Sequence, residues 1–284
     1  MIAVDPKNPK GIVWLASYPK SGNTWLRMFL YQLARIRLGQ PREEDEINKL
    51  GRVSVHEMLF DGIYKRFLGK PISEASPAEI LRVRPQVQAT IAERAPGVVF
   101  LKTHSVRAAL DGVPTINPAV SAGTIYLVRD PRDVAVSLWR HTGRSIDFAV
   151  ELLNRRNAFD FGTRETWGSW GQNVESWTEG ADASLLAIRY EDMLADRDAA
   201  FAAVLNHVGQ SATPDELAEA IRCSSFDEMK EQEDMHGFQE KHPASERFFV
   251  GGKMGGWRKT LTPEHVNSIV AAHGPIMKKF GYLD

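Results

Sequence analysis

Gly11-Ile-Val-Trp-Leu-Ala-Ser-Tyr-Pro-Lys-Ser-Gly-Asn-Thr-Trp25 is the stretch of sequence that decides the fold. Its first six residues form a short, mostly apolar run, as expected of a strand buried on both faces of a sheet. A turn containing Pro19 and Gly22 follows, and residues 24–38 then carry leucines at three- and four-residue spacing, which predicts a helix. The order of strand, tight turn and helix predicts the first unit of an α/β protein.

The rest of the chain repeats this alternation. Further short apolar runs lie at residues 98–101, 124–128 and 185–188. Helical patterns, several opened by Asp, Thr or Pro, predict helices at residues 133–141, 192–208, 214–221 and 263–280. Strands that alternate with helices predict a central parallel sheet flanked by helices on both faces. We find no repeat and no convincing linker, so we expect residues 1–284 to form one domain.

Composition and charge exclude several kinds of partner. The 284 residues are 43% hydrophobic and 25% charged, and the formal net charge of -1 gives no overall field that would attract nucleic acid or an anionic membrane. The single cysteine, Cys223, rules out an internal disulfide and is typical of a reducing compartment. Residues 1–10 lack an apolar signal core, and no apolar run approaches the roughly 20 residues needed to cross a bilayer. We therefore expect a soluble, cytoplasmic protein whose anion sites are built locally.

The turn at residues 18–25 has the properties of an anion-binding loop. Its backbone N–H groups would point at one spot, where the dipole of the following helix also favours negative charge. Gly22 lets a phosphate approach closely, Lys20 adds a mobile positive charge, and Ser21 and Thr24 add hydroxyl donors. The loop lacks the Gly-x-x-x-x-Gly-Lys-Ser/Thr pattern of nucleoside triphosphatases, and with it the usual hydroxyl ligand for magnesium. A plain polar turn before a helix is the alternative.

The same residues resemble the 5′-phosphosulfate loop of the cytosolic-type sulfotransferases, which use 3′-phosphoadenosine 5′-phosphosulfate (PAPS). The usual form of that loop is Tyr-Pro-Lys-Ser-Gly-Thr-Thr-Trp, from which only Asn23 departs, and Asn still offers a donor. The resemblance implies the P-loop NTPase-like sulfotransferase fold. It also implies that Lys20 contacts the bridging oxygen and the 5′-phosphate of PAPS. It also implies that Trp25 stacks on the adenine, as the π-face of a purine allows.

A second predicted strand end, in Thr124-Ile-Tyr-Leu-Val-Arg-Asp-Pro-Arg-Asp-Val-Ala-Val-Ser137, places Arg129 at the edge where open α/β sheets bind ligands. Its guanidinium suits a phosphate. Taken alone, the segment favours an Arg129–Asp133 ion pair, and a kinase site in which Asp130 binds magnesium is a further alternative. The spacing of Arg129, Asp133 and Ser137 resembles the family's 3′-phosphate motif, Arg-x-x-x-Asp-x-x-x-Ser. Two motifs of one family in the correct order favour the sulfotransferase over the kinase.

Val98-Val-Phe-Leu-Lys-Thr-His104 predicts a strand that runs into Lys-x-His, with Lys102 and His104 on one face because side chains alternate along a strand. This pair resembles the family's catalytic Lys-x-His. The resemblance implies that His104 is the general base for an acceptor hydroxyl, and that Lys20 and Lys102 stabilise charge on the leaving phosphate oxygen. No metal is then needed. Three rival histidines lack a strand-end lysine: His141, His236 and His242.

Three further segments resemble elements of the family. Residues 168–177 match its Gly-Ser-Trp helix, 185–193 its strand end Tyr-Glu-Asp-Met, and 223–229 its element Thr-Ser-Phe-x-x-Met. The resemblance implies that contacts to the adenine and ribose come from Tyr190, Ser225 and Phe226. The alternatives are a plain helix terminus at residues 223–229 and core packing, which we favour for Trp170 and Trp177.

The main departure from the family is Phe248-Phe-Val-Gly-Gly-Lys-Met-Gly-Gly-Trp257. The family commonly has Arg-Lys-Gly at the positions of Val250-Gly251-Gly252, and grips the 3′-phosphate with that Arg and Lys. Lys253 or Arg247 could substitute, and the glycines could present backbone N–H groups to the phosphate. We expect the 3′-phosphate to be held more weakly or in a different way.

The resemblance implies PAPS as donor, 3′-phosphoadenosine 5′-phosphate (PAP) as product, and a small-molecule acceptor with a hydroxyl or, less readily, an amine. Residues 39–88 are charged and irregular with no clear strand, so we expect helices and loops that cover the ligand edge and select the acceptor; a peripheral insert without a role is the alternative. Some aromatic residues hint at an apolar acceptor, although core packing explains each equally well: Phe60, Tyr64, Phe67, Phe148 and Phe161.

Two other classes of function stay open from the residues alone. The first is a P-loop kinase of a small metabolite, and the second is a non-catalytic module that keeps the fold for nucleotide or partner binding. The presence of Lys20, Lys102 and His104 argues against the second class. The family's dimer motif is altered at Pro263 and Asn267, so the sequence does not support that mode of dimerisation.

Overall fold

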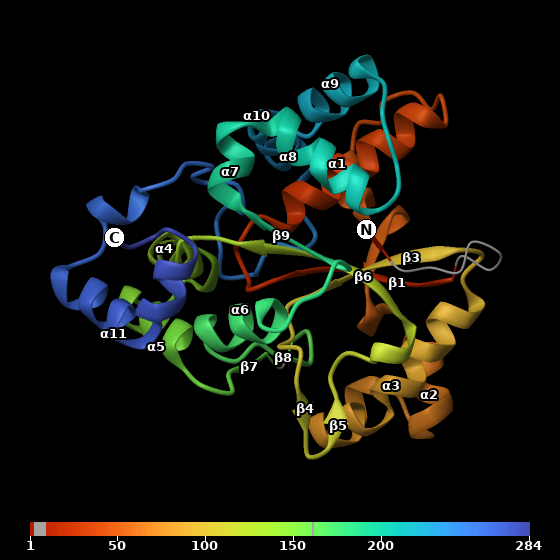
Figure 1. Ribbon diagram of the computed structural model, residues 1–284, viewed down its shortest axis with the longest axis horizontal. Coiled ribbons are helices and arrows are strands. Elements are labelled where there is room, and N and C mark those ends of the chain that lie inside the picture. Colours follow the sequence, from red (N-terminus) through yellow and green to blue (C-terminus); the bar gives the residue numbers. More distant parts are fainter. Residues whose placement is uncertain (3–9, 161) are drawn as a thin grey trace.

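The computed structural model describes residues 1–2, 10–160 and 162–284. Its centre is a five-stranded sheet in the order β2-β3-β1-β6-β9, and every neighbouring pair of strands is parallel. The strands are β1 (Gly11–Ser17), β2 (Ser54–His56), β3 (Val98–Thr103), β6 (Ser121–Val128) and β9 (Leu185–Arg189). The predicted α/β class, with a central parallel sheet between helices, is confirmed (Figure 1). Because all five strands run the same way, the loops after β1, β3 and β6 meet at one edge of the sheet.

The helices and two short antiparallel hairpins surround this sheet. The helices are α1 (Asn23–Arg37), α2 (Asp61–Leu68), α3 (Pro77–Arg94), α4 (Pro131–Thr142), α5 (Ile146–Asn154), α6 (Trp170–Thr178), α7 (Tyr190–Ala195), α8 (Arg197–His207), α9 (Pro214–Cys223), α10 (Phe226–His236) and α11 (Pro263–Lys279). The hairpins pair β4 (Ala109–Leu110) with β5 (Val113–Pro114), and β7 (Phe159–Asp160) with β8 (Glu165–Thr166). No helix in the described part of the chain is long and apolar enough to cross a membrane.

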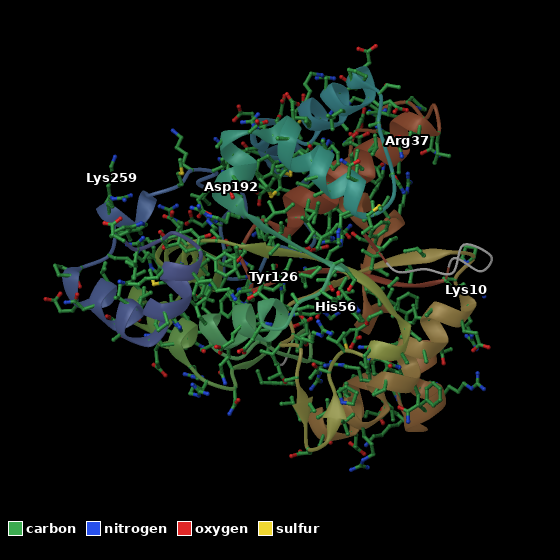
Figure 2. All side chains as sticks on the ribbon, viewed as in Figure 1. Lys10, Arg37, His56, Tyr126, Asp192 and Lys259 are labelled. Carbon is green, nitrogen blue, oxygen red and sulfur yellow. The ribbon has the colours of Figure 1, made fainter. Side chains whose placement is uncertain are left out.

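Alternation along β1 explains why both faces of the sheet are covered. Ile12, Trp14 and Ala16 join an apolar cluster with α3, α4, α6 and α11, whereas Val13 and Leu15 join a second cluster with α1, α8 and α9. Figure 1 shows these two sets of helices on opposite sides of the sheet. Figure 2 shows Tyr126 near the centre of the molecule, whereas the exposed Arg37 and Lys259 lie towards its edge.

Most predicted helices are confirmed, but the single helix at residues 192–208 is wrong. The chain forms α7 and α8 there, separated by Asp196, whose backbone is extended (φ -143°, ψ 91°). The Asp196 carboxylate accepts a hydrogen bond from the Ala199 N–H, 2.9 Å away, and so caps α8. An Asp inside an apolar pattern can therefore begin a new helix, which periodicity does not reveal.

The expectation that residues 39–88 contain no strand is also wrong. β2 lies at the edge of the sheet and pairs with β3, so that His56 stands opposite Lys102. Three residues, two of them polar, are too few to show the alternation of a strand. The segment also supplies α3, whose Ile80, Val87 and Ile91 are buried in the core. It therefore builds the fold and does not merely cover it.

Candidate active site

The turn between β1 and α1 has the backbone of an anion cradle. Lys20 is left-handed with a φ of 68°, and Gly22 has a φ of 104°. A Cβ at Gly22 would lie 2.7 Å from a ring carbon of Tyr190, so only glycine fits. The first N–H groups of α1 have no intrahelical partner, and the buried Ser21 hydroxyl has none among the described residues. The turn therefore holds unsatisfied polar groups at the positive end of a helix.

Three other residues of this turn are hydrogen-bonded or buried within the protein. Asn23 donates from Nδ2 to the carbonyl oxygen of Leu15, 2.8 Å away, which leaves its backbone N–H for a ligand. Thr24 and Trp25 are each 8% exposed. The Trp25 ring packs at a steep angle against Tyr190, with ring centroids 5.8 Å apart and 72° between the ring planes.

Lys20 places its ammonium over the ring of Phe248, 3.5 Å from the ring centroid. Burial, followed by the positive charges of Lys102 and Arg129, lowers the pKa of Lys20 to about 7, and two carboxylates oppose this shift only in part. The ammonium thus lies where positive charge is unfavourable, and a bound anion would relieve that strain.

Arg129, at the carboxyl end of β6, faces the same turn. Its guanidinium donates to the carbonyl oxygens of Lys20, at 3.1 Å, and of Lys253, at 3.3 Å. It also lies over the ring of Tyr190, with 4.4 Å from Cζ to the centroid. The buried Nε of Arg129 has no partner within the described chain. The turn, Arg129 and Lys253 are therefore one site, and its cations are satisfied only by backbone oxygens and rings.

Asp130 and Asp133 are occupied in ways that weaken both alternative interpretations. Asp133 accepts the N–H groups of Gly255 at 2.7 Å and Trp257 at 3.0 Å, so the proposed Arg129–Asp133 ion pair is wrong. Asp130 accepts the Arg132 N–H at the start of α4 and forms an ion pair with the Arg132 guanidinium at 2.8 Å. A kinase would need that carboxylate for magnesium.

The remaining predicted donor-site residues lie on three elements around this centre. Ser137 is half-buried on α4. Ser225 caps α10 by accepting the Glu228 N–H at 3.4 Å. Gly252, with a φ of 58°, packs so closely on Phe226 that a Cβ would lie 2.7 Å from the ring. Phe226 and the glycine segment are therefore in contact, as a shared adenosine site would require.

His104 follows β3, and its ring nitrogens have distinct environments. Nδ1 lies 2.8 Å from the carbonyl oxygen of Ser17. Because a carbonyl can only accept, Nδ1 carries the hydrogen, and the lone pair of the neutral imidazole is on Nε2. Burial, followed by the charge of Lys102, lowers the pKa of His104 to about 4. At neutral pH the imidazole is a base with a free lone pair.

Lys102, two residues before His104, forms an ion pair with Glu240 at 3.1 Å. Arg27 binds the same carboxylate through both terminal nitrogens, at 2.7 and 2.8 Å. Burial alone would raise the pKa of Glu240, but Lys102 and Arg27 outweigh it and hold that pKa well below its usual range. The sequence analysis missed Glu240 and Arg27, because no local pattern marks an ion pair between residues 213 positions apart.

The expected core tryptophans are confirmed, whereas the aromatic hints about the acceptor gain no support. Trp170 and Trp177 are 0% and 1% exposed. Tyr64 is fully buried, with its hydroxyl donating to Glu57 at 2.9 Å. Phe60 lines a cavity of about 580 Å³ beside Val99, at the amino end of β3 and away from His104. Phe67 is 38% exposed on α2, Phe148 lies under Arg144, and Phe161 lies outside the described residues.

Comparison with known proteins identifies the family to which this site belongs. Residues 10–281 match the sulfotransferase domain family. Cytosolic sulfotransferase 16 of Arabidopsis thaliana is 25% identical over 268 residues, which are 88% of this chain and 71% of that protein. Sulfotransferase 2A6 of Mus musculus is 31% identical over 119 residues, 39% of each chain.

Solved structures show the same fold. Retinol dehydratase in complex with androsterone and the inactive cofactor PAP has a TM-score of 0.62 at 20% identity, over 96% of this chain and 82% of that one. A mouse sulfotransferase complexed with PAP has a TM-score of 0.58 at 20% identity, over 97% and 86% of the two chains. The chain belongs to the sulfotransferase family, and the predicted membership in the PAPS-dependent sulfotransferases is confirmed.

Proposed function

We propose that this enzyme transfers a sulfuryl group from PAPS to a hydroxyl, or less readily an amine, of a small acceptor, with His104 as the general base. The observation that carries the proposal is a cluster of polar and positively charged groups formed by Lys20, Ser21 and Arg129. Within the described residues, the ammonium is desolvated, the guanidinium meets only backbone oxygens and a ring, and the hydroxyl is buried without a partner. These groups fit an anion, and the two solved relatives above are PAP complexes.

The donor would lie across the loops after β1 and β6. The 5′-phosphosulfate would be held by the β1–α1 turn: Lys20, Ser21, Gly22, Asn23 and Thr24. The adenosine would lie against Trp25, Tyr190, Ser225 and Phe226. The 3′-phosphate would face Arg129, Ser137, Gly252 and Lys253. The unsatisfied Ser21 hydroxyl and Arg129 Nε support this placement.

The chemistry would then be divided among three side chains. When bound, PAPS supplies the sulfuryl group, and PAP is the leaving group. His104 Nε2 accepts the proton of the acceptor hydroxyl, while Nδ1–H stays on the Ser17 carbonyl. Lys20 and Lys102 stabilise negative charge on the leaving phosphate oxygen, so the scheme uses no metal ion.

Arg140 would replace the cations that residues 250–252 lack. Its Nη1 lies 3.5 Å from the position of a Cβ on Gly251, and Arg140 stands one helical turn after Ser137 on α4. Arg140 is exposed, and it has no carboxylate partner in the described part of the chain. The guanidinium therefore lies within van der Waals contact of the point from which a side chain at Gly251 would extend.

Replacing Arg140 by Gln should weaken PAP binding by about tenfold, the effect of losing one charge-assisted hydrogen bond. Binding of adenosine 5′-monophosphate, which has no 3′-phosphate, should not change. Calorimetry with the two nucleotides measures the difference, and Arg144→Gln, another exposed arginine just beyond α4, is the matched control. Equal losses for both nucleotides would show that Arg140 does not recognise the 3′-phosphate.

Ligand-dependent thermal stability tests the proposed function as a whole. A ligand that binds only the folded state stabilises it by about 2.7 kcal/mol at one hundred times its Kd. PAP should therefore raise the melting temperature, whereas ATP with magnesium should leave it unchanged. Stabilisation by ATP with magnesium but not by PAP would favour a kinase and remove the sulfotransferase assignment for this site.

The acceptor is proposed as a small molecule, by analogy with the androsterone and retinol in solved relatives. Location in the cytoplasm is proposed from the relatives named as cytosolic sulfotransferases.

A further inference from the structure

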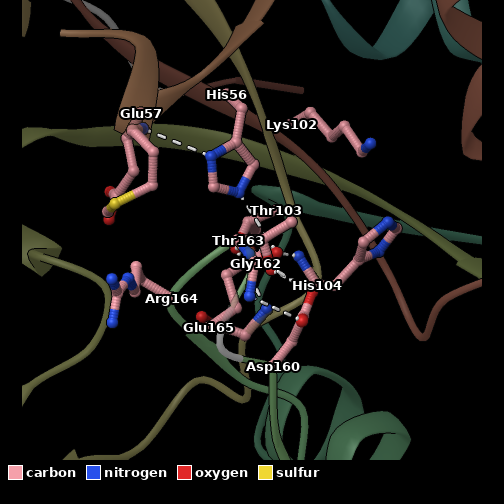
Figure 3. A network of polar contacts seen from close by, with 12 residues as sticks. His56, Glu57, Lys102, Thr103, His104, Asp160, Gly162, Thr163, Arg164 and Glu165 are labelled. Atoms are coloured by element: carbon pink, nitrogen blue, oxygen red, sulfur yellow. Dashed lines mark hydrogen bonds and ion pairs between the residues drawn. The ribbon is translucent and has the colours of Figure 1, made fainter. Parts of the chain in front are cut away.

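A buried carboxylate holds the end of the strand that carries His104 (Figure 3). Glu165, on β8, is 1% exposed. Its Oε1 accepts both the hydroxyl of Thr103 and the backbone N–H of His104, each at 2.7 Å. The carbonyl group of His104 is also held, because Asn173 Nδ2 donates to its oxygen at 2.8 Å. The backbone of His104 is thus fixed at its N–H and at its C=O.

The second oxygen of Glu165 faces His56, from the edge strand β2. His56 Nε2 lies 3.1 Å from Glu165 Oε2. The Met58 N–H donates to His56 Nδ1 at 3.2 Å, so in the neutral ring the hydrogen is on Nε2, which contacts the carboxylate without the geometry of a hydrogen bond. Glu165 therefore joins β2, β3 and the β7–β8 hairpin, three segments far apart in the sequence, at the general base.

We propose that Glu165 is a positioning residue for His104: it fixes the backbone of the base and supplies the negative charge that balances the imidazolium formed during transfer. The inference rests on the proposed function, in which His104 Nε2 takes the proton of the acceptor. That proton ends on Nε2, and Glu165 stays ionised throughout.

The charges around His104 explain why one carboxylate is needed. Lys102 on β3 and Lys20 in the β1–α1 turn are cations, while the neighbouring imidazoles, His56 on β2 and His141 on α4, bring no negative charge. Glu240 is already shared by Lys102 and Arg27. Glu165 is the anion on the remaining side, from β8. Without Glu165, the positive charge of the His104 imidazolium would form beside these lysines in a poorly hydrated site, with no anion to balance it.

The titration of the two groups agrees with this geometry. Burial would raise the pKa of Glu165, but His56 and His104 outweigh it and hold that pKa well below its usual range. In turn the Glu165 charge raises the pKa of His104 against the larger lowering by burial and Lys102. Removing the charge of Glu165 should therefore make His104 a weaker base.

The test is Glu165→Gln, which keeps the shape and an acceptor oxygen but removes the charge. Carbon-detected NMR of the imidazole ring follows His104 from pH 7 to pH 4. Wild type should begin to titrate towards the end of this range, and Glu165→Gln should titrate at lower pH or not at all. Glu46→Gln, which removes another fully buried carboxylate, paired with Arg35, should titrate His104 like wild type.

Kinetics separate positioning from general damage to the fold. With an acceptor that wild type sulfates, Glu165→Gln should lower kcat about ten- to a hundredfold, within the range of general-base effects, with little change in acceptor KM or PAP affinity. Glu165→Asp keeps the negative charge but has a side chain one methylene shorter. Compared with Glu165→Gln, it should bring the His104 titration back towards wild type more than it does kcat. If Glu165→Gln does not fold, Glu165→Asp still decides, because an unchanged rate in that variant overturns the positioning role.

Failure of this inference can be told apart from failure of the proposed function. If PAP does not bind wild type, the proposed function is wrong, whatever Glu165 does to His104. If PAP binds and wild type transfers sulfate, but Glu165→Gln matches wild type in rate and in the His104 titration, only the inference about Glu165 is overturned.

Discussion

Replacing His104 by Ala should lower the turnover of an accepted hydroxyl substrate by about a hundredfold or more, while PAP still binds with nearly wild-type affinity. The neutral imidazole has its lone pair on Nε2, because Nδ1–H is held by the Ser17 carbonyl. Losing it leaves water as the only proton acceptor, and a positioned base contributes roughly 10²–10⁴ in rate. Steady-state kinetics and calorimetry on the same preparation measure both quantities.

His236→Ala is the matched control for this variant, because His236 is an exposed histidine at the end of α10. It should keep both the rate and the affinity of wild type. Near-normal turnover in His104→Ala would remove His104 from the mechanism, and the inference about Glu165 with it.

Replacing Lys20 by Met should weaken PAP binding by about ten- to a hundredfold and lower turnover further. The ammonium lies in the β1–α1 turn, and no carboxylate in the described part of the chain is bonded to it, so its charge is available to the donor. Loss of a charge-assisted hydrogen bond costs about 1.5–3 kcal/mol, and each 1.4 kcal/mol is tenfold in Kd. Calorimetry gives the affinity, and exposed Lys259→Met should leave it unchanged.

The lowered pKa of Lys20 adds a pH dependence to this prediction. In the free protein that pKa is about 7, so Lys20 is charged at pH 6 and largely neutral at pH 8. A bound phosphate would raise the pKa, so binding at pH 8 should take up close to one proton, and PAP affinity should fall as the pH rises above 7. Calorimetry in buffers of different ionisation enthalpy counts the protons. Equal uptake by wild type and Lys20→Met would rule out Lys20 as the titrating group.

How far the sequence predicts this protein depends on how local each feature is. The β1–α1 turn and the end of β6 are continuous segments, so their spacing was enough to place Lys20 and Arg129 at one edge of a parallel sheet. The predicted sheet and most helices are confirmed for the same reason. Arg129 shows the limit: whether it binds Asp133 could not be decided until the N–H groups of Gly255 and Trp257 were found on that carboxylate.

Features that depend on distant segments were missed. β2 is too short to show a period, and it is a strand only because β3 lies beside it. Glu165 stands 61 residues after His104, and nothing in its surrounding sequence distinguishes it from a surface glutamate. Arg140 comes close to Gly251 although the two residues are far apart in the sequence. Contacts between residues far apart in the sequence form only when the chain folds, so local sequence patterns do not predict them.

The two arginine bonds to Glu240 bear on the role proposed for Lys102, which would have to turn from that carboxylate towards the donor. If Lys102 were the only partner of Glu240, releasing it would leave this carboxylate, whose side chain is 35% exposed, without a cation beside it. Arg27 already grips both oxygens of that carboxylate, so Lys102 can leave without stranding a charge. In the proposed mechanism, Lys102 would therefore exchange its contact with Glu240 for one with the leaving phosphate oxygen, while Arg27 keeps the carboxylate paired.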